Sequence, residues 1–446
     1  MTNPRLFGTG GIRGDAEKLF TNQFCFDIGR SFIRFLSQKE VKNKIIAFGM
    51  DSRPSSIRIK KAVMSGIKSG RQISDEGIIP TPALNYFTQQ KNCAGIMVTG
   101  SHIDVELNGL KFFVNEKEFN KSDEKIMEQI YSEEKEKIPY KLKTVDFRIN
   151  SEAQKLYVKM LVNLAKADSQ VKVVIDAGNG TQSKTVPEAL ENLGVKVVRI
   201  NCDLNKTMLA RDTETEDAFP ELKNAVVREK ANFGIGYDAD GDRAIFVDEN
   251  GFALNGEVSC SIIAKRSKEL TIVTPINTSS VVEHLGKKVI RTKVGASYVV
   301  EAMKQHGSKV GFESNGGYIS GEIFYSRDGG STTIKMLNLL IKTAKRLSEL
   351  VAELPKYYTI KNKTDCPREI NTLILTEVRK RYTKQKIEDL DGLKVWMDSN
   401  SWVLFRPSGN APEFRVFAEA KTDTKAKKLA KEGMALVKKV IEENKK

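Results

Sequence analysis

The sequence predicts three related α/β domains followed by a smaller C-terminal α+β domain. The chain of 446 residues is too long for one core, because domains usually hold about 100–150 residues. Short β-branched runs alternate with helical segments as far as residue 355, which is typical of βαβ units with mostly parallel sheets. The pattern changes after that point. We therefore expect domains at residues 1–147, 148–248, 249–355 and 356–446.

The first domain shows the rhythm that the next two repeat: strand, turn, helix and strand. A strand over 45–49 precedes a helix that reaches residue 70, and CAGIMVTG forms a later buried strand. The charge-dense, helix-prone stretch 121–143 closes the domain. In α/β folds the loops at the carboxyl ends of strands bind ligands, so we expect the site there.

The remaining elements follow from the same signals. Strands are expected in 171–176, 195–200 and on both sides of the loop in 231–251, with a helix over 185–194 and strand–helix alternation over 271–312. The C-terminal domain reads as a helix over 368–382, antiparallel strands in 391–398, 401–409 and 414–420, and an amphipathic helix over 424–446.

Composition excludes several classes of protein. Hydrophobic content of 40% and charged content of 29% are those of a globular chain, and no apolar run approaches the roughly 20 residues of a membrane span. The net charge of +15 comes from lysines mixed with glutamates, which favours a solvated surface over nucleic-acid binding. The five cysteines are scattered and form no zinc or redox motif. With no signal peptide at MTNPRLFGTGG, we expect a cytoplasmic protein with free thiols.

The segment GYDADGDRAIFVD predicts a metal site. Asp238, Asp240 and Asp242 alternate in a loop between two apolar strands, where their oxygens can converge on one hard cation such as Mg²⁺. A calcium-binding helix–loop–helix needs glycine at the sixth loop position, where Arg243 stands, and a strand follows instead of a helix. Arg243 could grip a phosphate. The alternative is a polar hairpin with three solvated acids.

Three further segments have candidate binding residues. The turn in FRPSGNAPEFR resembles an anion nest, although a turn with an incidental arginine is the alternative. The segment GFESNGGYI suits either hydroxyl recognition or a solvated turn. The loop FGTGGIRG matches neither the dinucleotide fingerprint nor the P-loop, which counts against an ATP-driven kinase. The candidates are Arg406, Ser408, Gly409, Asn410 and Arg415; Glu313, Ser314 and Asn315; and Arg13.

The serine in VTGSHIDVELNGLKF is the candidate nucleophile. In a strand, Ser101 and His102 would point to opposite faces, so their adjacency does not make a catalytic pair. There is no G-x-S-x-G elbow, and only three histidines could complete a triad. With an acidic loop, arginines and anion nests elsewhere in the chain, Ser101 fits phosphoryl chemistry better.

These motifs together resemble those of the α-D-phosphohexomutases, the superfamily of phosphoglucomutase, phosphomannomutase and phosphoglucosamine mutase. FGTGGIRG, VTGSH, DADGDR, RTKVGASYV, GFESNGG and RPSGNAP occur in the family's order over the whole chain. The resemblance implies three α/β domains with mixed sheets around a central cleft and a mobile C-terminal α+β lid. It implies an isomerase that moves a phosphoryl group between O1 and O6 of a hexose phosphate through a phosphoserine and a hexose bisphosphate, which also serves as activator.

The resemblance also implies roles for the candidate residues. Ser101 would carry the phosphoryl group and share one Mg²⁺ per chain with Asp238, Asp240 and Asp242. His102 and Lys111 would assist proton transfer, since a lysine in a cationic site can have a lowered pKa. Arg13 belongs to the N-terminal loop, and Arg243 would stabilise phosphate charge. The sugar hydroxyls would be bound by Glu313, Ser314 and Asn315, and the non-reacting phosphate by Arg406, Ser408, Gly409, Asn410 and Arg415.

The sequence departs from the family pattern at four places. Gly100 replaces the usual alanine, Ile103-Asp104 the usual Asn-Pro, Gly317 the usual histidine, and Asn410-Ala411 the usual Thr-Glu. The choice among glucose, mannose and glucosamine phosphates stays open, as does the choice between monomer and homodimer. Two other functions remain as alternatives: a metal-dependent sugar-phosphate phosphatase using Ser101, and a non-catalytic polyanion binder.

Overall fold

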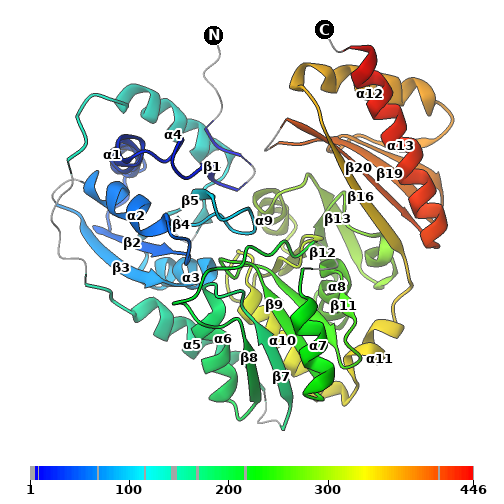
Figure 1. The fold of residues 1–446 in the computed structure, drawn as a ribbon, viewed down its shortest axis with the longest axis horizontal. Helices are drawn as coiled ribbons and strands as arrows, with labels where there is room; N and C mark the ends of the chain where they lie inside the picture. The colour runs from blue at the N-terminus through cyan, green and yellow to red at the C-terminus, as the bar shows by residue number, and fades with distance from the viewer. Residues whose placement is uncertain are drawn as a thin grey trace. The chain divides into compact units, whose positions relative to one another are not determined.

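The computed structural model divides the chain into two compact units (Figure 1). The first comprises Met1–Ile263 and Asn315–Val351, and the second Ala264–Ser314 and Ala352–Lys446. The structure describes residues 6–8, 10–67, 70–114, 117–141, 148–166, 170–214, 218–409 and 412–444.

A six-stranded mixed sheet begins the first unit. Its strand order is β1-β5-β4-β2-β3, with β6 beside β5; β2 is parallel to β3 and β4, and β5 is antiparallel to β4 and β1. The strands are β1 (Ile12–Asp15), β2 (Ile45–Met50), β3 (Gln72–Ile78), β4 (Ala94–Val98), β5 (Leu107–Val114) and β6 (Lys117–Glu118). Its central strands therefore end in the loops that follow Met50 and Val98.

The helices of this region bury apolar faces against the sheet. Helix α1 buries Ile28, Phe32 and Phe35, which recur at helical spacing, in one core with residues of α2, α4, β2, β4 and β5. A capping box of Asn120 and Asp123 starts α4. The helices are α1 (Asn22–Gln38), α2 (Ser56–Ser65), α3 (Thr81–Lys91) and α4 (Lys121–Glu134).

The first unit contains a second mixed sheet, with five strands in the order β11-β10-β9-β7-β8. Strand β7 is parallel to β8 and β9, whereas β10 runs antiparallel to β9, so the β9–β10 connection is a short loop. The strands are β7 (Lys172–Asp176), β8 (Lys196–Ile200), β9 (Phe233–Tyr237), β10 (Ala244–Asp248) and β11 (Ala253–Leu254). Helices here are α5 (Glu152–Leu164), α6 (Gln182–Glu191), α7 (Pro220–Arg228), α8 (Gly256–Arg266) and α10 (Gly329–Thr343), and a short strand β15 spans Tyr318–Ser320.

The second unit joins part of the third α/β domain to the C-terminal domain. Strand β12 (Thr271–Pro275) is parallel to β13 (Lys288–Thr292) and β14 (Val310–Phe312), and the connections contain the 3₁₀ helix η1 (Ser280–His284) and α9 (Ala296–Gln305). A five-stranded sheet of the order β16-β20-β19-β18-β17, antiparallel throughout, forms the C-terminal domain. Its elements are β16 (Tyr358–Asp365), β17 (Lys386–Glu388), β18 (Leu393–Asp398), β19 (Ser401–Pro407), β20 (Glu413–Ala420), η2 (Arg368–Ile370), α12 (Asn371–Arg381) and α13 (Asp423–Glu443), with α11 (Leu347–Ala352) before them.

Both faces of the C-terminal sheet are covered, which explains the continuous apolar run SWVLF. Val403 and Phe405 pack in one core with residues of α12 and α13, whereas Trp402 and Leu404, one position out of phase, pack with Ile276, which follows β12. A strand buried on both faces shows no alternation of polar and apolar residues.

The predicted fold class is confirmed. Some bounds differ: the helix after β2 ends at Ser65 and not near Gly70, and the first helical segment of the alternation over 271–312 is the 3₁₀ helix η1. Among the described residues, no helix has the length and apolar character needed to cross a bilayer.

Candidate active site

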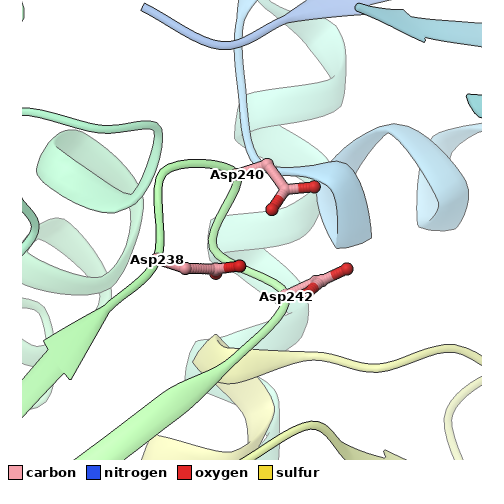
Figure 2. Close-up of side chains that lie close together, drawn as sticks. All are labelled: Asp238, Asp240 and Asp242. Atoms are coloured by element: carbon pink, nitrogen blue, oxygen red, sulfur yellow. The ribbon is translucent and has the colours of Figure 1, made fainter. Parts of the chain in front are cut away.

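Three buried aspartates occupy the β9–β10 loop. Asp238, Asp240 and Asp242 are at most 2% exposed, and each offers an oxygen within 4.8 Å of those of the other two. Figure 2 shows all three carboxylates projecting from the one loop. The alternative of a hairpin with solvated acids is therefore wrong.

The charges and hydrogen bonds of this loop fit a divalent cation. Burial, and then the proximity of Asp240 and Asp242, raises the pKa of Asp238 well above its usual range. Asp240 Oδ1 and Asp242 Oδ1 are buried and have no hydrogen-bond partner among the described residues. Hard cations take carboxylate oxygens of this kind, so the three acids could bind a metal.

Ser101 lies directly beside the acidic loop. Its hydroxyl donates a hydrogen bond of 2.9 Å to Asp238 Oδ2, although 137 residues separate the two. Ser101 is 3% exposed and has a left-handed backbone with φ of 53°. That conformation is uncommon for residues other than glycine, so contacts around the loop must hold it.

His102 is next to Ser101 but does not carry a charge. β4 ends at Val98, and Ser101 stands in a turn, so the strand alternation expected from the sequence does not apply; Nδ1 lies 3.4 Å from the Ser101 hydroxyl. The positive charge of Arg243, followed by burial and by Arg13, lowers the pKa of His102 to about 2. The imidazole is thus neutral at physiological pH.

Lys111 enters the acidic loop from β5. Its ammonium donates to Asp240 Oδ2 at 2.7 Å and to Asp242 Oδ2 at 2.8 Å, and the side chain is 1% exposed. Burial disfavours the charged form, but Asp240 and Asp242 outweigh it and raise the pKa of Lys111. The lowered lysine pKa expected from the sequence is wrong for this arrangement, in which Lys111 neutralises two acids.

Two arginines bring unused donors to the same region. Arg243 Nε lies 3.7 Å from Asp238 Oδ2 and from Asp242 Oδ1, beyond hydrogen-bond distance. Arg13 Nη1 and the Nε and Nη1 of Arg243 are buried without a hydrogen-bond partner in the described part of the chain. Buried guanidinium donors need acceptors, and phosphate oxygens suit their geometry.

Sequence reasoning missed Arg53, which holds the Ser101 loop. Its guanidinium is wholly buried and donates to main-chain carbonyls of the loop: Ser101 at 2.8 Å, Ile103 at 2.6 Å, Leu107 at 2.9 Å, and Asp104. Asp51 accepts from Arg53 Nε and from the main-chain N–H of Gly100. A signal was available, because DSRPSS directly follows β2 at the carboxyl end of the strand.

Two other neighbours of the acids were also missed. Thr81 opens α3 and donates its hydroxyl to Asp240 Oδ2 at 2.6 Å, while Arg327 donates to Asp242 Oδ2 at 2.6 Å. Thr81 follows β3 by three residues and could have been found as a loop residue at a strand end. No motif singled out Arg327.

The candidate phosphate-binding residues lie in the second unit. Arg406 on β19 and Arg415 on β20 are direct cross-strand partners, so two like charges share one position in the ladder. Arg406 donates to Asp391 at 2.7 Å, and Arg415 Nε is buried without a partner among the described residues. The N–H of Ser408 donates to Glu413 across the turn, and Gly409 is exposed. Asn410 lies outside the described residues.

The GFESNGG segment follows β14. Glu313, Ser314 and Asn315 are all buried, which excludes a solvated turn. Asn277 donates to the hydroxyl of Ser314 at 3.4 Å, and Thr213 donates to the carbonyl of Asn315 at 2.7 Å. The boundary between the two units falls between Ser314 and Asn315.

Comparisons with known proteins agree with this geometry. Models of the phosphoglucomutase/phosphomannomutase family match as α/β/α domain I over residues 4–137, domain II over 155–251 and domain III over 255–358. A phosphoglucomutase/phosphomannomutase of Thermococcus kodakarensis is 34% identical, covering 98% of this chain and 99% of its own. A phosphoglucosamine mutase of Caldanaerobacter subterraneus is 32% identical, covering 96% and 97%.

Solved structures share the fold along the whole chain. A phosphoglucomutase/phosphomannomutase family protein from Burkholderia thailandensis aligns with a TM-score of 0.82 at 21% identity, covering 99% of this chain and 98% of its own. An Aspergillus fumigatus N-acetylphosphoglucosamine mutase in complex with GlcNAc-6P and magnesium aligns with a TM-score of 0.62 at 13% identity, covering 98% and 96%. Another structure of that mutase, with glucose 1,6-bisphosphate, has a TM-score of 0.62 at 12% identity and covers 99% and 96%.

Proposed function

Because this chain belongs to the phosphoglucomutase/phosphomannomutase family, whose members are mutases and therefore isomerases, we propose a specific reaction for it. The protein moves a phosphoryl group between O1 and O6 of a hexose phosphate through a phosphoserine at Ser101 and a bisphosphorylated sugar. The observation that carries this proposal is the position of the Ser101 hydroxyl, 2.9 Å from Asp238 in the buried acidic loop.

In the proposed reaction Ser101 acts as a phosphoryl carrier. The bond from phosphorus to Ser101 Oγ breaks while a bond to a sugar hydroxyl oxygen forms, and the proton of that sugar hydroxyl ends on Ser101 Oγ. The bisphosphorylated sugar then turns round, and its other phosphoryl group returns to Ser101. Such transition states spread negative charge over the phosphoryl oxygens, so fixed donors accelerate them. Arg13 and Arg243 have buried donors available for those oxygens.

The charges around His102 and Lys111 limit the roles that each can have in proton transfer. The imidazole of His102, 3.4 Å from Ser101, is neutral, and its lowered pKa makes it a weak proton acceptor, so it can orient the Ser101 hydroxyl through a hydrogen bond. Lys111 holds its charge against two aspartates, so in this arrangement it stabilises charge and is not a free base. We propose that His102 and Lys111 assist catalysis in these roles.

One divalent cation per chain, Mg²⁺, would be held by Asp238, Asp240, Asp242 and Ser101. It would supply Lewis-acid stabilisation of charge on the phosphoryl oxygens. The two unpartnered carboxylate oxygens support this assignment.

We propose that the other candidates bind a small phosphosugar. Arg406, Ser408, Gly409, Asn410 and Arg415 would hold the non-reacting phosphate, and the cross-strand arginine pair supports an anion there. Glu313, Ser314 and Asn315 would bind sugar hydroxyls. Glucose, mannose and glucosamine phosphates are the candidate substrates, and a hexose 1,6-bisphosphate is the activator.

The proposal also covers the domain boundaries, the cellular location and the oligomeric state. We propose domain boundaries near residues 147, 248 and 355, and a cytoplasmic location, which the five free cysteines support. The protein would act as a monomer or homodimer.

The proposal is tested with Ser101→Ala and the control Ser37→Ala. The Ser37 hydroxyl donates to the carbonyl of Ile33 within α1. A coupled assay would compare glucose, mannose and glucosamine 1-phosphates with Mg²⁺ and a trace of bisphosphate. We expect turnover and a phosphorylated Ser101 peptide in the wild type and in the control, and neither in Ser101→Ala. Net release of inorganic phosphate without isomerisation would support a phosphatase instead.

A further inference from the structure

A continuous row of donors and acceptors runs through the acidic loop. Thr81 and Lys111 both donate to Asp240 Oδ2, at 2.6 and 2.7 Å. Lys111 and Arg327 both donate to Asp242 Oδ2, at 2.8 and 2.6 Å. The row therefore reads Thr81, Asp240, Lys111, Asp242, Arg327, and its members come from four separate segments of the first unit.

All of these hydrogen bonds end on the same oxygen, Oδ2, of Asp240 and of Asp242. In both Asp240 and Asp242 the Oδ2 atom receives two donors, and the Oδ1 atom is buried with no hydrogen-bond partner among the described residues; Arg243 Nε lies 3.7 Å from Asp242 Oδ1. A carboxylate held at one oxygen cannot rotate about its axis without breaking two charge-assisted or hydroxyl hydrogen bonds. The free oxygen of each acid is thus fixed in direction.

Thr81 also fixes the backbone of the loop. Its N–H donates to the carbonyl of Asp240 at 2.9 Å, so the same residue holds both the main chain and the side chain of one acid. Gln182 donates to the neighbouring carbonyl of Gly241 at 3.0 Å. Thr81 is 1% exposed, so water does not compete for these bonds.

Gly317 makes the position of Arg327 possible. A Cβ added at Gly317 would meet Cδ of Arg327 at 2.5 Å and Oδ1 of Asn315 at 3.0 Å. The Arg327 side chain therefore passes over the glycine on its way to Asp242. This close approach gives a physical reason for glycine where the family usually has histidine.

We propose that Thr81 and Arg327 are positioning residues of the acidic loop, each occupying Oδ2 of one aspartate and so directing Oδ1 toward a divalent cation. The inference rests on the cation that the proposed function assigns to this loop. Groups that orient metal ligands in this way typically change metal affinity by about 10–100-fold when they are removed.

The test measures metal binding itself, with Mn²⁺ as the probe and electron paramagnetic resonance of the free ion as the readout. Thr81→Val removes only the hydroxyl and keeps shape and charge, and we expect its Mn²⁺ Kd to rise about 10–100-fold. Thr81→Ser, which restores the hydroxyl, should return to near the wild-type value. Thr88→Val is the matched control, since Thr88 lies in the same helix, is buried and donates only to Asn85 within it.

Arg327 needs a variant that keeps its charge. Arg327→Met would remove a positive charge beside the acids, and that alone strengthens cation binding. Gly317→Ala instead displaces the side chain and leaves the charge in the protein. We expect Gly317→Ala to weaken Mn²⁺ binding as Thr81→Val does, and both variants to melt close to the wild type.

The outcomes separate this inference from the proposed function. Unchanged Mn²⁺ affinity in both Thr81→Val and Gly317→Ala would overturn the positioning role, whatever happens to turnover. A wild type that binds no Mn²⁺ would overturn it as well. If both variants bind Mn²⁺ more weakly but the wild type isomerises no hexose phosphate, the positioning role is supported and the proposed function is contradicted.

Discussion

At the scale of single residues, the turn of Ser101, the proposed phosphoryl carrier, depends on Arg53, a residue outside the recognised motifs. Arg53 donates to the carbonyls of Ser101 and Ile103, and an added Cβ at Gly100 would meet its guanidinium carbon at 2.4 Å. The family's usual Asn-Pro is absent here. A proline would restrain the loop through its fixed φ, and in this chain the hydrogen bonds of Arg53 restrain it instead. Gly100 leaves the room that this arginine needs.

We predict that Arg53→Lys loosens the Ser101 loop. A lysine cannot satisfy all the carbonyls that Arg53 reaches, and each buried acceptor left unpaired costs about 1–3 kcal/mol. Hydrogen exchange should show faster exchange of the amides of residues 100–107, together with less phosphate on Ser101. Arg58→Lys is the control, because Arg58 lies in the neighbouring helix and donates to the carbonyls of Ala16 and Phe20, away from the loop. Equal exchange in the wild type and Arg53→Lys would contradict this role.

At the scale of elements, most strands and helices follow from the sequence, because their apolar spacing is local. Strands β18, β19 and β20, the terminal helix, the β9–β10 loop and the strand before Ser101 all lie where the pattern predicts them, whereas β16 and β17 were not predicted. Apolar spacing does not assign Thr81, Arg53 or Arg327 to the site, although Thr81 and Arg53 stand in loops at strand ends. Their partners are 159, about 50 and 85 residues away, and only the tertiary fold brings those segments together.

The direction of the Lys111 pKa shift also could not be predicted from the sequence. The sequence places Lys111 among cations, from which a lowered pKa follows. The fold instead sets its ammonium between two aspartates at 2.7 and 2.8 Å, and the direction reverses. Which neighbours surround a charge decides the sign of its shift, and that information is tertiary.

We predict that Mg²⁺ stabilises the acidic loop and the unit around it. Three buried acids repel one another without a cation, and a ligand that binds only the folded state adds about 2.7 kcal/mol at a hundred times its Kd. Thermal unfolding should shift upward with Mg²⁺ and return with a chelator. The shift should vanish in Asp242→Asn, and K⁺ at equal ionic strength should not reproduce it. An upward shift of equal size in Asp242→Asn would rule out the loop as the cation's site.

At the scale of the whole chain, the C-terminal domain is joined to residues 264–314 by buried polar groups as well as by apolar contact. Glu419 is wholly buried and accepts from the indole of Trp402 at 2.9 Å and from the N–H of Ser280 at 2.9 Å. Lys394 donates to the carbonyl of Ile276 at 3.1 Å and lies 4.1 Å from the Trp402 ring. A hinge that frees the C-terminal domain alone would have to break these bonds, so the second unit should move as one body.

Lys394 makes the stability of this unit depend on pH. Burial, and then the charge of Arg291, lowers the pKa of Lys394 to about 7 from a usual 10.5. The unfolded chain therefore binds the extra proton between those pH values, and stability must rise with pH across that window. Below about pH 7 both states are protonated, and the full cost of the buried ammonium remains.

We predict that Lys394→Met is more stable than the wild type near pH 7 and loses this advantage by about pH 10. The pKa difference corresponds to about 5 kcal/mol, which is the largest gap to expect at and below pH 7. Urea unfolding of both proteins at a series of pH values measures the gap directly. Lys428→Met, at an exposed position of α13, is the control and should show no pH-dependent gap. A gap for Lys394→Met that stays constant up to pH 10 would contradict this prediction. It would mean that Trp402 and the Ile276 carbonyl keep the lysine charged inside the fold, because only a proton bound equally in both states leaves the slope at zero.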